Sequence, residues 1–554
     1  MATISLGKVA LKWRGVYDSA TAYNGQDIVS YEGTSYIAKV DAPVGQAPSN
    51  TQYWDVFAQG VEGLAQNAGD LLYFDGQQLQ VLPAGGENQV LRIGAGGLPE
   101  WAQPTIRSGL KAVGLMKDGF SYRRMGAIMS DGGLRVWGDN GQYLHGTGNT
   151  TFARSYPVRT AFPATAGKIT KWVSSANYSC AAIDEFGKLW TWGINSYGEC
   201  GVGNASSVQV PYCASDNASN SIYGKTVIDI AVSHSYEGFN THMVLCADGT
   251  VHTCGYNGYG QCGQGDTTQR NNFVQVPLLT NIVQIAQGRE RYGSMFALKA
   301  DGAMYSWGYN GNGELGQNST TQMNIPMQIM YFAQNSISIA KMGSGGSSAW
   351  AIDTNDNLYT WGYNGYGNLG VNNTTQQNAP VFAYAGVVDC EMHSGSNDYC
   401  NTYIITTNNE LWAAGDNTYG SLGVAADTTD RSSFTQCMKA DGTPMNNVIK
   451  VVAGGTGSYN FAVALDMNGV CYGTGYNGNG QLGVGNMNGT VYWFNPVLIH
   501  IRKVVDVETV GYSSEGGTAF LMDDGQVYQT GYAGNAQLPE DDHESIAVPM
   551  PVIF

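Results

Sequence analysis

Charged side chains are scarce in this sequence. They make up 13% of the 554 residues, and 44 acidic residues outnumber 27 basic ones, which gives a formal net charge of -17. A surface of this sign repels phosphate backbones, and the Lys and Arg residues are scattered along the chain without forming a basic stripe. The composition therefore argues against nucleic acid as a partner.

Long apolar runs and heptad repeats are also missing. No run of roughly eighteen apolar residues occurs, so we expect no membrane insertion. No heptad pattern predicts a coiled coil. Glycine (75 residues) and tyrosine (34 residues) are abundant instead. Glycine suits tight turns and tyrosine suits half-buried strands, so the composition favours an all-β fold.

The clustered motifs of metal sites and common catalytic centres are absent as well. The ten cysteines include no Cys-x-x-Cys pair, and neither a His-x-x-Glu-His nor a Gly-x-Ser-x-Gly motif occurs. We therefore expect no metal, no cofactor and no enzymatic activity. Cys200 and Cys262 replace a leucine of sister repeats such as Leu315, which predicts buried, reduced thiols. The paired carboxylates of a glycoside hydrolase leave no sequence trace, so that activity stays open.

What the sequence does contain is a long internal repeat. A glycine that follows an apolar or aromatic strand recurs at intervals of 53 to 62 residues, at Gly138, Gly193, Gly255, Gly308, Gly362, Gly415, Gly475 and Gly531. Such a fixed period is the mark of a repeat architecture, because each unit must bury its apolar face against the next one.

The unit around Gly308 shows the pattern most fully. Apolar strands are expected over residues 282–286, 295–298 and 304–307, and Pro326 precedes a fourth strand. Asp301-Gly302 between two apolar runs predicts a tight hairpin turn, because glycine adopts the positive φ that the turn needs. A proline is tolerated ahead of the outermost strand, because an edge strand need not donate every ladder hydrogen bond. Four strands in roughly fifty-five residues suit one propeller blade.

These units resemble the repeat of the regulator of chromosome condensation family, whose signature is a D-G turn, a W-G strand end and N-x-x-G-x-L-G. Residues 301–302, 307–308 and 310–316 match it, as do residues 361–362 and 364–370. The resemblance implies a β-propeller of four-stranded repeats over residues 109–554. Eight units imply eight blades, or seven if the first or last unit is a partial closing segment. We do not expect the family's nucleotide-exchange activity beside chromatin in so acidic a chain.

Residues 1–60 form a small aromatic-rich β module. The run from Tyr23 to Ala38 resembles the chitin-binding modules of bacterial chitinases, which often bind sugar through a Trp pair soon after the alanine. Lys39, Val40 and Asp41 stand there instead, so we favour a structural role for most of these rings over sugar binding. The candidate binding aromatics are Trp13, Tyr31, Tyr36 and Trp54.

Residues 61–108 form a second small β-rich module, with short β runs at 71–74, 79–82 and 90–93 between Gly-rich turns. They resemble connector segments of tailed-bacteriophage tail and virion proteins, in which chitin-binding-like modules also precede fibres. The order of segments predicts a bacteriophage structural protein, either a tail fibre or a receptor-binding, adhesin-type virion protein. We expect it to be assembled in the bacterial cytoplasm and located in the tail or another external appendage.

The expected partners follow from this hypothesis. Residues 1–105 would bind other virion proteins, and the propeller would contact a host cell-surface glycan or protein as part of a homo-oligomer. Two alternatives remain open: a surface-polysaccharide depolymerase and a propeller-type protein inhibitor. Two polar insertions, Cys213–Gly224 and Ala425–Asn447, either reach a partner or are surface loops, and we favour surface loops.

The candidate site follows from strand order. In a four-stranded meander the first and third loops lie on the same face. The third loops carry a repeated Tyr-Asn-Gly motif, which either caps the turn or binds a partner. The first loops differ between units, and variable loops on a rigid scaffold commonly carry recognition. The candidate binding residues of the first loops are Tyr122, Arg123, Tyr178, Tyr236, Arg289, Arg291, Tyr292, Tyr399 and Tyr459.

Overall fold

The chain divides into two compact units, Met1–Ser108 and Gly109–Phe554, each of which is considered by itself. The computed structural model describes residues 12–32, 34–58, 71–74, 79–82, 90–93, 99–102, 110–116, 124–150, 154–175, 178–233, 239–288, 293–394, 400–455, 457–499, 502–512, 515–532, 545–552 and 554.

The described residues of the first unit form three small sheets. Strands β1 (Lys12–Val16), β2 (Asp27–Tyr31), β3 (Thr34–Ala38) and β4 (Trp54–Ala58) form a four-stranded sheet in chain order. Two hairpins follow, β5 (Leu71–Phe74) with β6 (Leu79–Leu82), and β7 (Val90–Ile93) with β8 (Pro99–Ala102). The subdivision of this unit into modules 1–60 and 61–108 stays a prediction.

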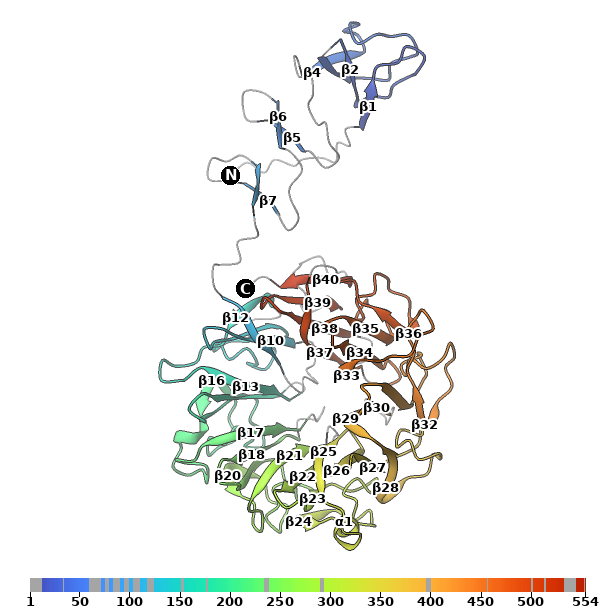
Figure 1. The fold of residues 1–554 in the computed structure, drawn as a ribbon. Coiled ribbons are helices and arrows are strands. Elements are labelled where there is room, and N and C mark those ends of the chain that lie inside the picture. Colours follow the sequence, from blue (N-terminus) through green and yellow to red (C-terminus); the bar gives the residue numbers. More distant parts are fainter. Residues whose placement is uncertain are drawn as a thin grey trace. The chain divides into compact units, whose positions relative to one another are not determined.

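The described residues of the second unit form eight four-stranded antiparallel sheets, arranged around a ring (Figure 1). The all-β class and the four-stranded repeats are thus confirmed. The first strands of the sheets lie innermost in the ring: β9 (Ala112–Leu115), β13 (Ile169–Ser174), β17 (Val227–Val232), β21 (Ile282–Gln287), β25 (Ile339–Ser344), β29 (Val387–Ser394), β33 (Val448–Gly454) and β37 (Val504–Tyr512).

The remaining strands lie progressively farther out. The second strands are β10 (Arg124–Met129), β14 (Ser179–Asp184), β18 (Thr241–Cys246), β22 (Ser294–Lys299), β26 (Ser348–Asp353), β30 (Cys400–Thr406), β34 (Phe461–Asp466) and β38 (Glu515–Met522). The third strands are β11 (Leu134–Gly138), β15 (Leu189–Gly193), β19 (Val251–Gly255), β23 (Met304–Gly308), β27 (Asn357–Gly362), β31 (Leu411–Gly415), β35 (Cys471–Tyr476) and β39 (Val527–Gly531). The outermost strands are β12 (Arg154–Arg159), β16 (Val208–Cys213), β20 (Arg270–Gln275), β24 (Met323–Gln328), β28 (Gln377–Ala385), β32 (Arg431–Gln436), β36 (Thr490–Pro496) and β40 (Ile546–Val552).

Helix is confined to two short segments in the part of the chain that the structure describes. These are the 3-10 turn η1 (Ala214–Asp216) and helix α1 (Met330–Gln334), both in links from one sheet to the next. Among the described residues, neither helical segment has the length and apolarity needed to cross a membrane.

The Asp-Gly turns form as expected. Gly302 has φ +83°, and the carboxylate Oδ1 of Asp301 accepts a hydrogen bond from Ala303 N at 3.0 Å. Glycine adopts a left-handed φ without the steric strain that most other residues incur, so the dipeptide favours the turn between β22 and β23.

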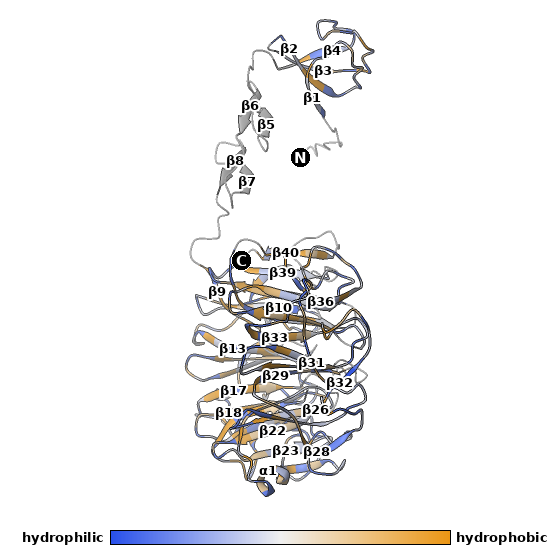
Figure 2. Cartoon of the chain, turned by 45° about the vertical axis from the view of Figure 1, so that its right-hand side comes forward, coloured by the Kyte–Doolittle hydropathy of each residue, from blue (hydrophilic) through white to orange (hydrophobic). Residues whose placement is uncertain are grey.

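The apolar core lies between neighbouring sheets. Strands of this unit are mostly hydrophobic, whereas much of the loop surface is hydrophilic (Figure 2). Leu315, from the N-x-x-G-x-L-G motif, is fully buried, and so are Cys200 and Cys262 at the same repeat position. The ten cysteines are free thiols, of which all but Cys213 are buried. The cysteines therefore pack as small apolar side chains.

Each Trp of a W-G strand end links its sheet to the preceding one. Trp307 Nε1 donates to Gln261 O at 2.8 Å, and Trp361 Nε1 donates to Glu314 O at 2.7 Å. Cys254 occupies the same repeat position as these tryptophans, and its thiol donates to Glu199 O at 3.0 Å. The signature tryptophan is thus buried, and its indole N–H is engaged in a hydrogen bond to the preceding sheet.

The last sheet contacts the first one. Trp137 Nε1 on β11 donates to Gln529 Oε1 on β39 at 2.6 Å, and Ala112 N donates to Gly525 O at 2.9 Å. The ring of Trp137 also packs edge-on against Phe554. These contacts close the circle of sheets.

Most outermost strands carry a proline, but it lies inside the strand and not ahead of it as predicted for Pro326, because the outer edge of such a strand needs no N–H for the ladder. It lies inside β12, β16, β24, β28 and β40, at Pro157, Pro211, Pro326, Pro380 and Pro549. The equivalent position holds Phe273 in β20, Phe434 in β32 and Phe494 in β36. The two insertions run beside β20 and β36: Phe273 N donates to Asn220 Oδ1 at 2.8 Å, and Phe494 N donates to Met438 O at 3.0 Å.

Candidate functional site

The first and third loops of each sheet meet on one face of the second unit. Tyr256 N in a third loop donates to Asn240 O in a first loop at 2.8 Å, and Tyr476 N donates in the same way to Asn460 O at 2.9 Å. Gly193 shows how closely these loops approach, because an added Cβ would lie 2.4 Å from Tyr178 O. The meander therefore brings the two loop sets together as expected.

The Asn of the Tyr-Asn-Gly motif holds the third loop in shape. Asn310 Nδ2 donates to Ser319 O and to Thr321 O, both at 2.9 Å, and its Oδ1 accepts from Leu315 N at 2.9 Å. Asn257, Asn364 and Asn477 make the equivalent bonds in their loops. The Asn side chain is buried, and both its amide nitrogen and its oxygen are hydrogen-bonded within the loop. This supports the turn-capping interpretation for this residue.

The Gly of the motif lets the preceding tyrosine ring fold back over the loop. A Cβ added at Gly311 would lie 2.1 Å from the hydroxyl oxygen of Tyr309, and Gly365 stands in the same relation to Tyr363 at 2.2 Å. Neither glycine has a positive φ, so the requirement is steric. The motif thus fixes the position of each ring as well as the turn.

The aromatic rings of these loops contact one another along the face. We call them the tyrosine face. One group contains Tyr197, Phe239, Tyr256, Tyr259 and Tyr309, with successive ring centroids 4.7 to 6.4 Å apart. A second pair is Tyr363 with Tyr366. A third group contains Tyr419, Tyr459 and Tyr476, in which Tyr419 and Tyr459 stack at 5.6 Å with an angle of 19°. All of these rings are half-buried.

The structure describes only two of the nine first-loop candidates. Tyr459 belongs to the tyrosine face, and Tyr178 is half-buried at the start of a second strand. Tyr122, Arg123, Tyr236, Arg289, Arg291, Tyr292 and Tyr399 lie outside the described residues, and their role stays a prediction. Sequence reasoning did not single out Phe239, although it lies between Tyr197 and Tyr256 in the face.

Buried carboxyl groups lie in the third loops that carry the tyrosine face, namely those of Glu199, Glu314 and Asp416. Burial raises the pKa of Glu199 to about 8, even though its Oε2 accepts from Tyr197 N at 2.8 Å. Burial likewise raises the pKa of Asp416 to about 6, against hydrogen bonds from Thr418 and Asn460 that lower it. Glu199 is therefore largely protonated at neutral pH. Glu199 is the x residue of a G-x-L-G motif in which cysteine replaces leucine. Because the x residue varies between repeats, the sequence alone did not indicate that an acid would be buried there.

The described histidines of the third sheet are held by hydroxyl groups. His242 Nε2 lies 2.8 Å from Ser179 Oγ, and burial lowers the pKa of His242 to about 3. His252 Nδ1 lies 2.6 Å from Ser221 Oγ and Nε2 lies 2.9 Å from Thr250 Oγ1. Among the residues with described positions, no group of three or more His, Cys, Asp or Glu could hold a metal ion.

The aromatic candidates of the first unit fall into two classes. Trp54 is 1% exposed, and its Nε1 donates to Gln46 O at 2.9 Å, so it belongs to the core of the small sheet. Tyr31 and Tyr36 are half-buried and contact each other edge-on, while Trp13 is 57% exposed. Only Trp13, Tyr31 and Tyr36 of these four present surface to a ligand.

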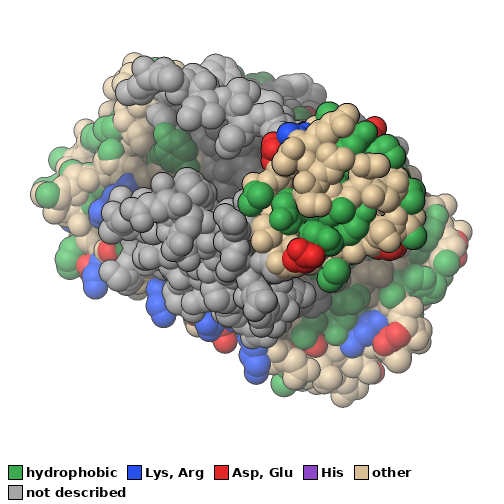
Figure 3. Space-filling view, turned by 90° about the horizontal axis from the view of Figure 1, so that it is seen from above, with side chains coloured by type: hydrophobic (Ala, Val, Ile, Leu, Met, Phe, Trp, Pro, Cys, Tyr) green, Lys and Arg blue, Asp and Glu red, His purple; other side chains and the backbone are tan. Residues whose placement is uncertain are grey.

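Uncharged side chains cover most of the described surface seen from above (Figure 3). Exposed ion pairs are dispersed, for example Lys188 with Asp216 and Arg270 with Asp266. The rings of the tyrosine face offer apolar surface together with hydroxyl groups, so this face is suited to contacts through ring surfaces and hydrogen bonds.

Comparisons with known proteins agree with this architecture. The model of the regulator of chromosome condensation (RCC1) repeat matches residues 187–236, 248–290 and 301–352. The chain is 27% identical to the human E3 ubiquitin-protein ligase HERC2 over 373 residues, 66% of this chain and 7% of the relative. It is 26% identical to the ultraviolet-B receptor UVR8 of Arabidopsis thaliana over 265 residues, 48% of this chain and 56% of the relative.

The chain thus spans less than two thirds of the length of either relative. Among solved structures, human WBSCR16 is similar with a TM-score of 0.51 and 18% identity, covering 71% of this chain and 100% of that one, which shows a shared fold. The second unit therefore has an RCC1-like β-propeller fold, and three of its segments match the repeat of the regulator of chromosome condensation family.

Proposed function

We propose that this chain is a structural protein of a tailed bacteriophage, located in a tail fibre or another external appendage of the virion. Residues 1–105 attach it to other virion proteins, and the propeller contacts a glycan or protein on the host surface as part of a homo-oligomer. Support comes from the order of segments along the chain: an aromatic-rich β module, two hairpins and a large ring.

We further propose that the ring has eight blades. Each of the eight four-stranded sheets has its own innermost strand, and the hydrogen bond from Trp137 to Gln529 joins the last sheet to the first. Closure through side chains leaves every sheet face covered by a neighbour, which makes a rigid support for the loops.

The tyrosine face is the observation that carries the proposed host contact. Its rings are held by neighbouring rings and by the glycines beneath them, so little side-chain entropy is lost when a partner binds. Tyrosine offers a broad apolar surface and a hydroxyl group in one rigid side chain, a combination that adaptable binding loops also use. Such rings stack on sugars and pack on protein surfaces.

The test is adsorption of the purified full chain to host cells. We expect Tyr419→Ala combined with Tyr459→Ala to weaken adsorption at least about tenfold, since buried aromatic anchors each contribute about 1–2 kcal/mol. The matched control is Tyr223→Ala. Tyr223 is 58% exposed in the link between η1 and β17, on the opposite side of the sheets from the first and third loops.

Equal adsorption of both variants and the parent, at equal thermal stability, would show that the tyrosine face serves only the fold. Release of reducing ends from host capsule during the same incubation would favour the depolymerase alternative over a binding protein. Labelling of virions with antibody against the chain checks the location.

A further inference from the structure

Basic residues are distributed unevenly between the two sides of the propeller. One side carries the first and third loops. The other side, which we call the turn side, carries the turns between second and third strands and the links between sheets. The lysines of the second unit that the structure describes lie on the turn side or in the adjoining half of an innermost strand: Lys111, Lys168, Lys171, Lys188, Lys225, Lys299, Lys341, Lys439, Lys450 and Lys503. Among the described residues, the tyrosine face therefore has no lysine.

The third loops carry acidic residues and no basic ones. They are residues 139–153, 194–207, 256–269, 309–322, 363–376, 416–430, 477–489 and 532–545, which contain no Lys or Arg. Their acidic residues are Asp139, Glu199, Asp266, Glu314, Asp416, Asp427, Asp430, Glu540, Asp541, Asp542 and Glu544. In the first loops, the basic residues Lys117, Arg123, Arg289 and Arg291 are matched in number by Asp118, Glu237, Glu290 and Asp398. A face with this excess of acidic residues repels anionic ligands.

Two arginines at the start of outermost strands are neutralised by the third loops. Arg270 Nη2 lies 2.7 Å from Asp266 Oδ2, and Arg431 Nη2 lies 2.9 Å from Asp427 Oδ2. Each carboxylate belongs to the loop that precedes its arginine. These two arginines therefore give the tyrosine face no unpaired cation.

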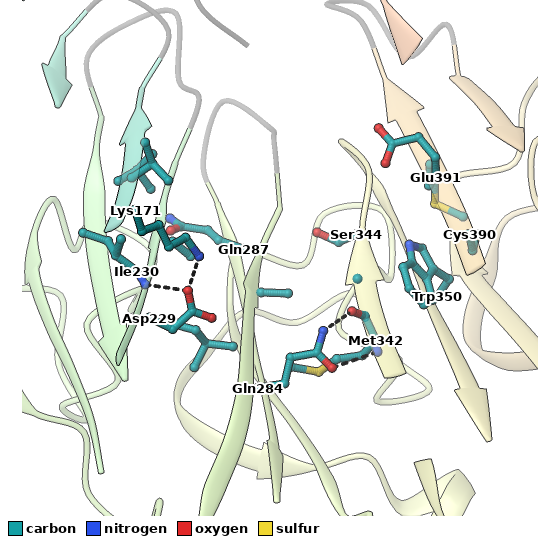
Figure 4. A pocket seen from close by; sticks show the side chains of 17 residues that line it. Lys171, Asp229, Ile230, Gln284, Gln287, Met342, Ser344, Trp350, Cys390 and Glu391 are labelled. Carbon is teal, nitrogen blue, oxygen red and sulfur yellow. Dashed lines mark hydrogen bonds and ion pairs between the residues drawn. The ribbon is translucent and has the colours of Figure 1, made fainter. Parts of the chain in front are cut away.

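Two of the lysines that reach the centre of the ring are also paired with carboxylates. Strands β13, β17, β21, β25 and β29 line a cavity of about 280 Å³, and in its wall Lys171 forms an ion pair with Asp229 of the next sheet (Figure 4). Lys450 Nζ lies 2.7 Å from Asp506 Oδ1 and 2.6 Å from Glu508 Oε1. These lysines link neighbouring innermost strands and do not reverse the sign of the tyrosine face.

The rings that cross from the second sheet to the fourth are bordered by amide groups. These rings are Tyr197, Phe239, Tyr256, Tyr259 and Tyr309, and we call them the ring arc. Gln269 Nε2 donates to Asn271 Oδ1 at 3.3 Å, and Gln322 Nε2 donates to Asn324 Oδ1 at 3.4 Å. An amide group both donates and accepts hydrogen bonds, as a sugar hydroxyl does.

The asparagine of each pair lies close to the ring arc. A Cβ added at Gly198, which follows Tyr197, would lie 2.4 Å from Asn271 Oδ1. A Cβ added at Gly260, which follows Tyr259, would lie 2.3 Å from Asn324 Oδ1.

A third amide pair stands at the end of the ring arc. Gln376 Nε2 donates to Asn378 Oδ1 at 2.7 Å, and a Cβ added at Gly313, in the loop of Tyr309, would lie 2.3 Å from that oxygen. At the next three junctions between sheets the place of the asparagine is taken by Ser432, Tyr492 and Ala547. The amide pairs therefore follow the ring arc.

Exposed aliphatic side chains gather on the turn side. Val113, Ile228, Val283, Ile449 and Val505 each occupy the second position of an innermost strand and are more than half exposed. Among the first-loop and third-loop residues that the structure describes, Met487 is the one exposed large aliphatic side chain. The core of a protein interface is usually apolar. Aromatic rings bordered by amides, without aliphatic neighbours, suit a sugar chain better.

We propose that the ring arc binds a chain of neutral sugars, whose rings stack on the tyrosines and whose hydroxyl groups hydrogen-bond to the Gln–Asn pairs. The inference rests on the proposed function and narrows it. Within a host contact made by the tyrosine face, the ligand is a glycan and not a protein, and it carries no carboxylate or phosphate groups. Stacking itself favours a neutral sugar, since the negative face of an aromatic ring repels an anion.

Surface plasmon resonance with the full chain tests the proposal. The immobilised probes are dextran, mannan and galactan as neutral polymers, and alginate, hyaluronan and polygalacturonate as acidic ones. We expect the parent to bind at least one neutral polymer, equally at low and high salt, and to bind no acidic polymer. Gln269→Leu combined with Gln322→Leu should weaken the binding about tenfold, because two hydrogen-bonding amides are lost.

The matched control is Gln275→Leu combined with Gln328→Leu. These two amides end the same outermost strands, β20 and β24, on the turn side, so the control should bind like the parent. Ser196→Lys places a cation on the exposed residue before Tyr197 and should create binding to an acidic polymer that high salt abolishes. Equal melting temperatures show that each variant is folded.

Binding of the parent to an acidic polymer as strongly as to any neutral one would overturn the proposal. So would binding to no neutral polymer, or an equal loss in the two double variants. Adsorption to host cells separates the inference from the proposed function. If protease treatment of the cells abolishes adsorption and periodate oxidation of their sugars does not, the sugar ligand is refuted and the virion role is kept. Adsorption to no host cell would contradict the virion role itself.

Discussion

His242 on β18 is completely buried beside Ser179 of the neighbouring sheet. Burial disfavours its charged form and lowers its pKa from 6.5 to about 3, whereas in the unfolded chain it titrates near 6.5. The unfolded state therefore binds the extra proton below pH 6.5, and stability is lost as the pH falls towards 3. We predict that the parent loses about 2 kcal/mol more unfolding free energy than His242→Gln between pH 7 and pH 5. Urea unfolding at both pH values measures the difference.

Glu199 provides the control of opposite sign. Its pKa is raised by burial from 4.5 to about 8, so the stability it contributes is complete below 4.5 and is lost as the pH rises through 8. Glu199→Gln should therefore remove a loss of stability between pH 4.5 and pH 8. Because that change opposes the one from His242, lowering the pH from 7 to 5 should destabilise Glu199→Gln more than the parent. Identical pH profiles of the parent and His242→Gln would contradict the burial argument for His242.

At the scale of the element, the tryptophan at the end of a third strand joins two sheets. Trp307→Phe keeps the apolar ring but leaves Gln261 O buried without its donor. We expect the free energy of unfolding to fall by about 1–2 kcal/mol, measured by urea unfolding. Trp412→Phe is the control, because Trp412 is only half-buried and its Nε1 reaches Glu410 at 3.4 Å. A loss as large in Trp412→Phe would show that ring size, not the link between sheets, determines the effect.

The elements of the propeller could be predicted because their signals are local. Asp301-Gly302 specifies a turn between adjacent strands, and Asn310 bonds only within its own loop. The buried state of Glu199 and the partners of His242 could not be predicted, since both depend on how one sheet packs on another. The cavity was missed for the same reason: its wall is assembled from Lys171 to Glu391, and no single repeat contains it.

At the scale of the whole molecule, closure depends on residues at opposite ends of the second unit. Trp137 and Gln529 are 392 positions apart, so no local pattern indicates their contact. Gln529→Leu leaves Trp137 Nε1 buried without that acceptor, and we predict a loss of about 1–3 kcal/mol of unfolding free energy. Gln526→Leu, in the adjacent turn, should cost far less. Calorimetry gives the melting temperatures of both variants. Equal values would mean that the contact between the first and last sheets depends on apolar packing and not on the hydrogen bond from Trp137 to Gln529.

The outermost strands have a consequence for the behaviour of many copies together. An exposed strand edge invites pairing with the edge of another chain, and a proline removes the N–H group on which such pairing depends. Where β20 and β36 carry phenylalanine instead, the insertions take up that N–H through Asn220 and Met438. The insertions thus cover the outer edges of β20 and β36. Shortening either one would leave the N–H of Phe273 or of Phe494 free to pair with a strand edge of another chain, which would promote aggregation.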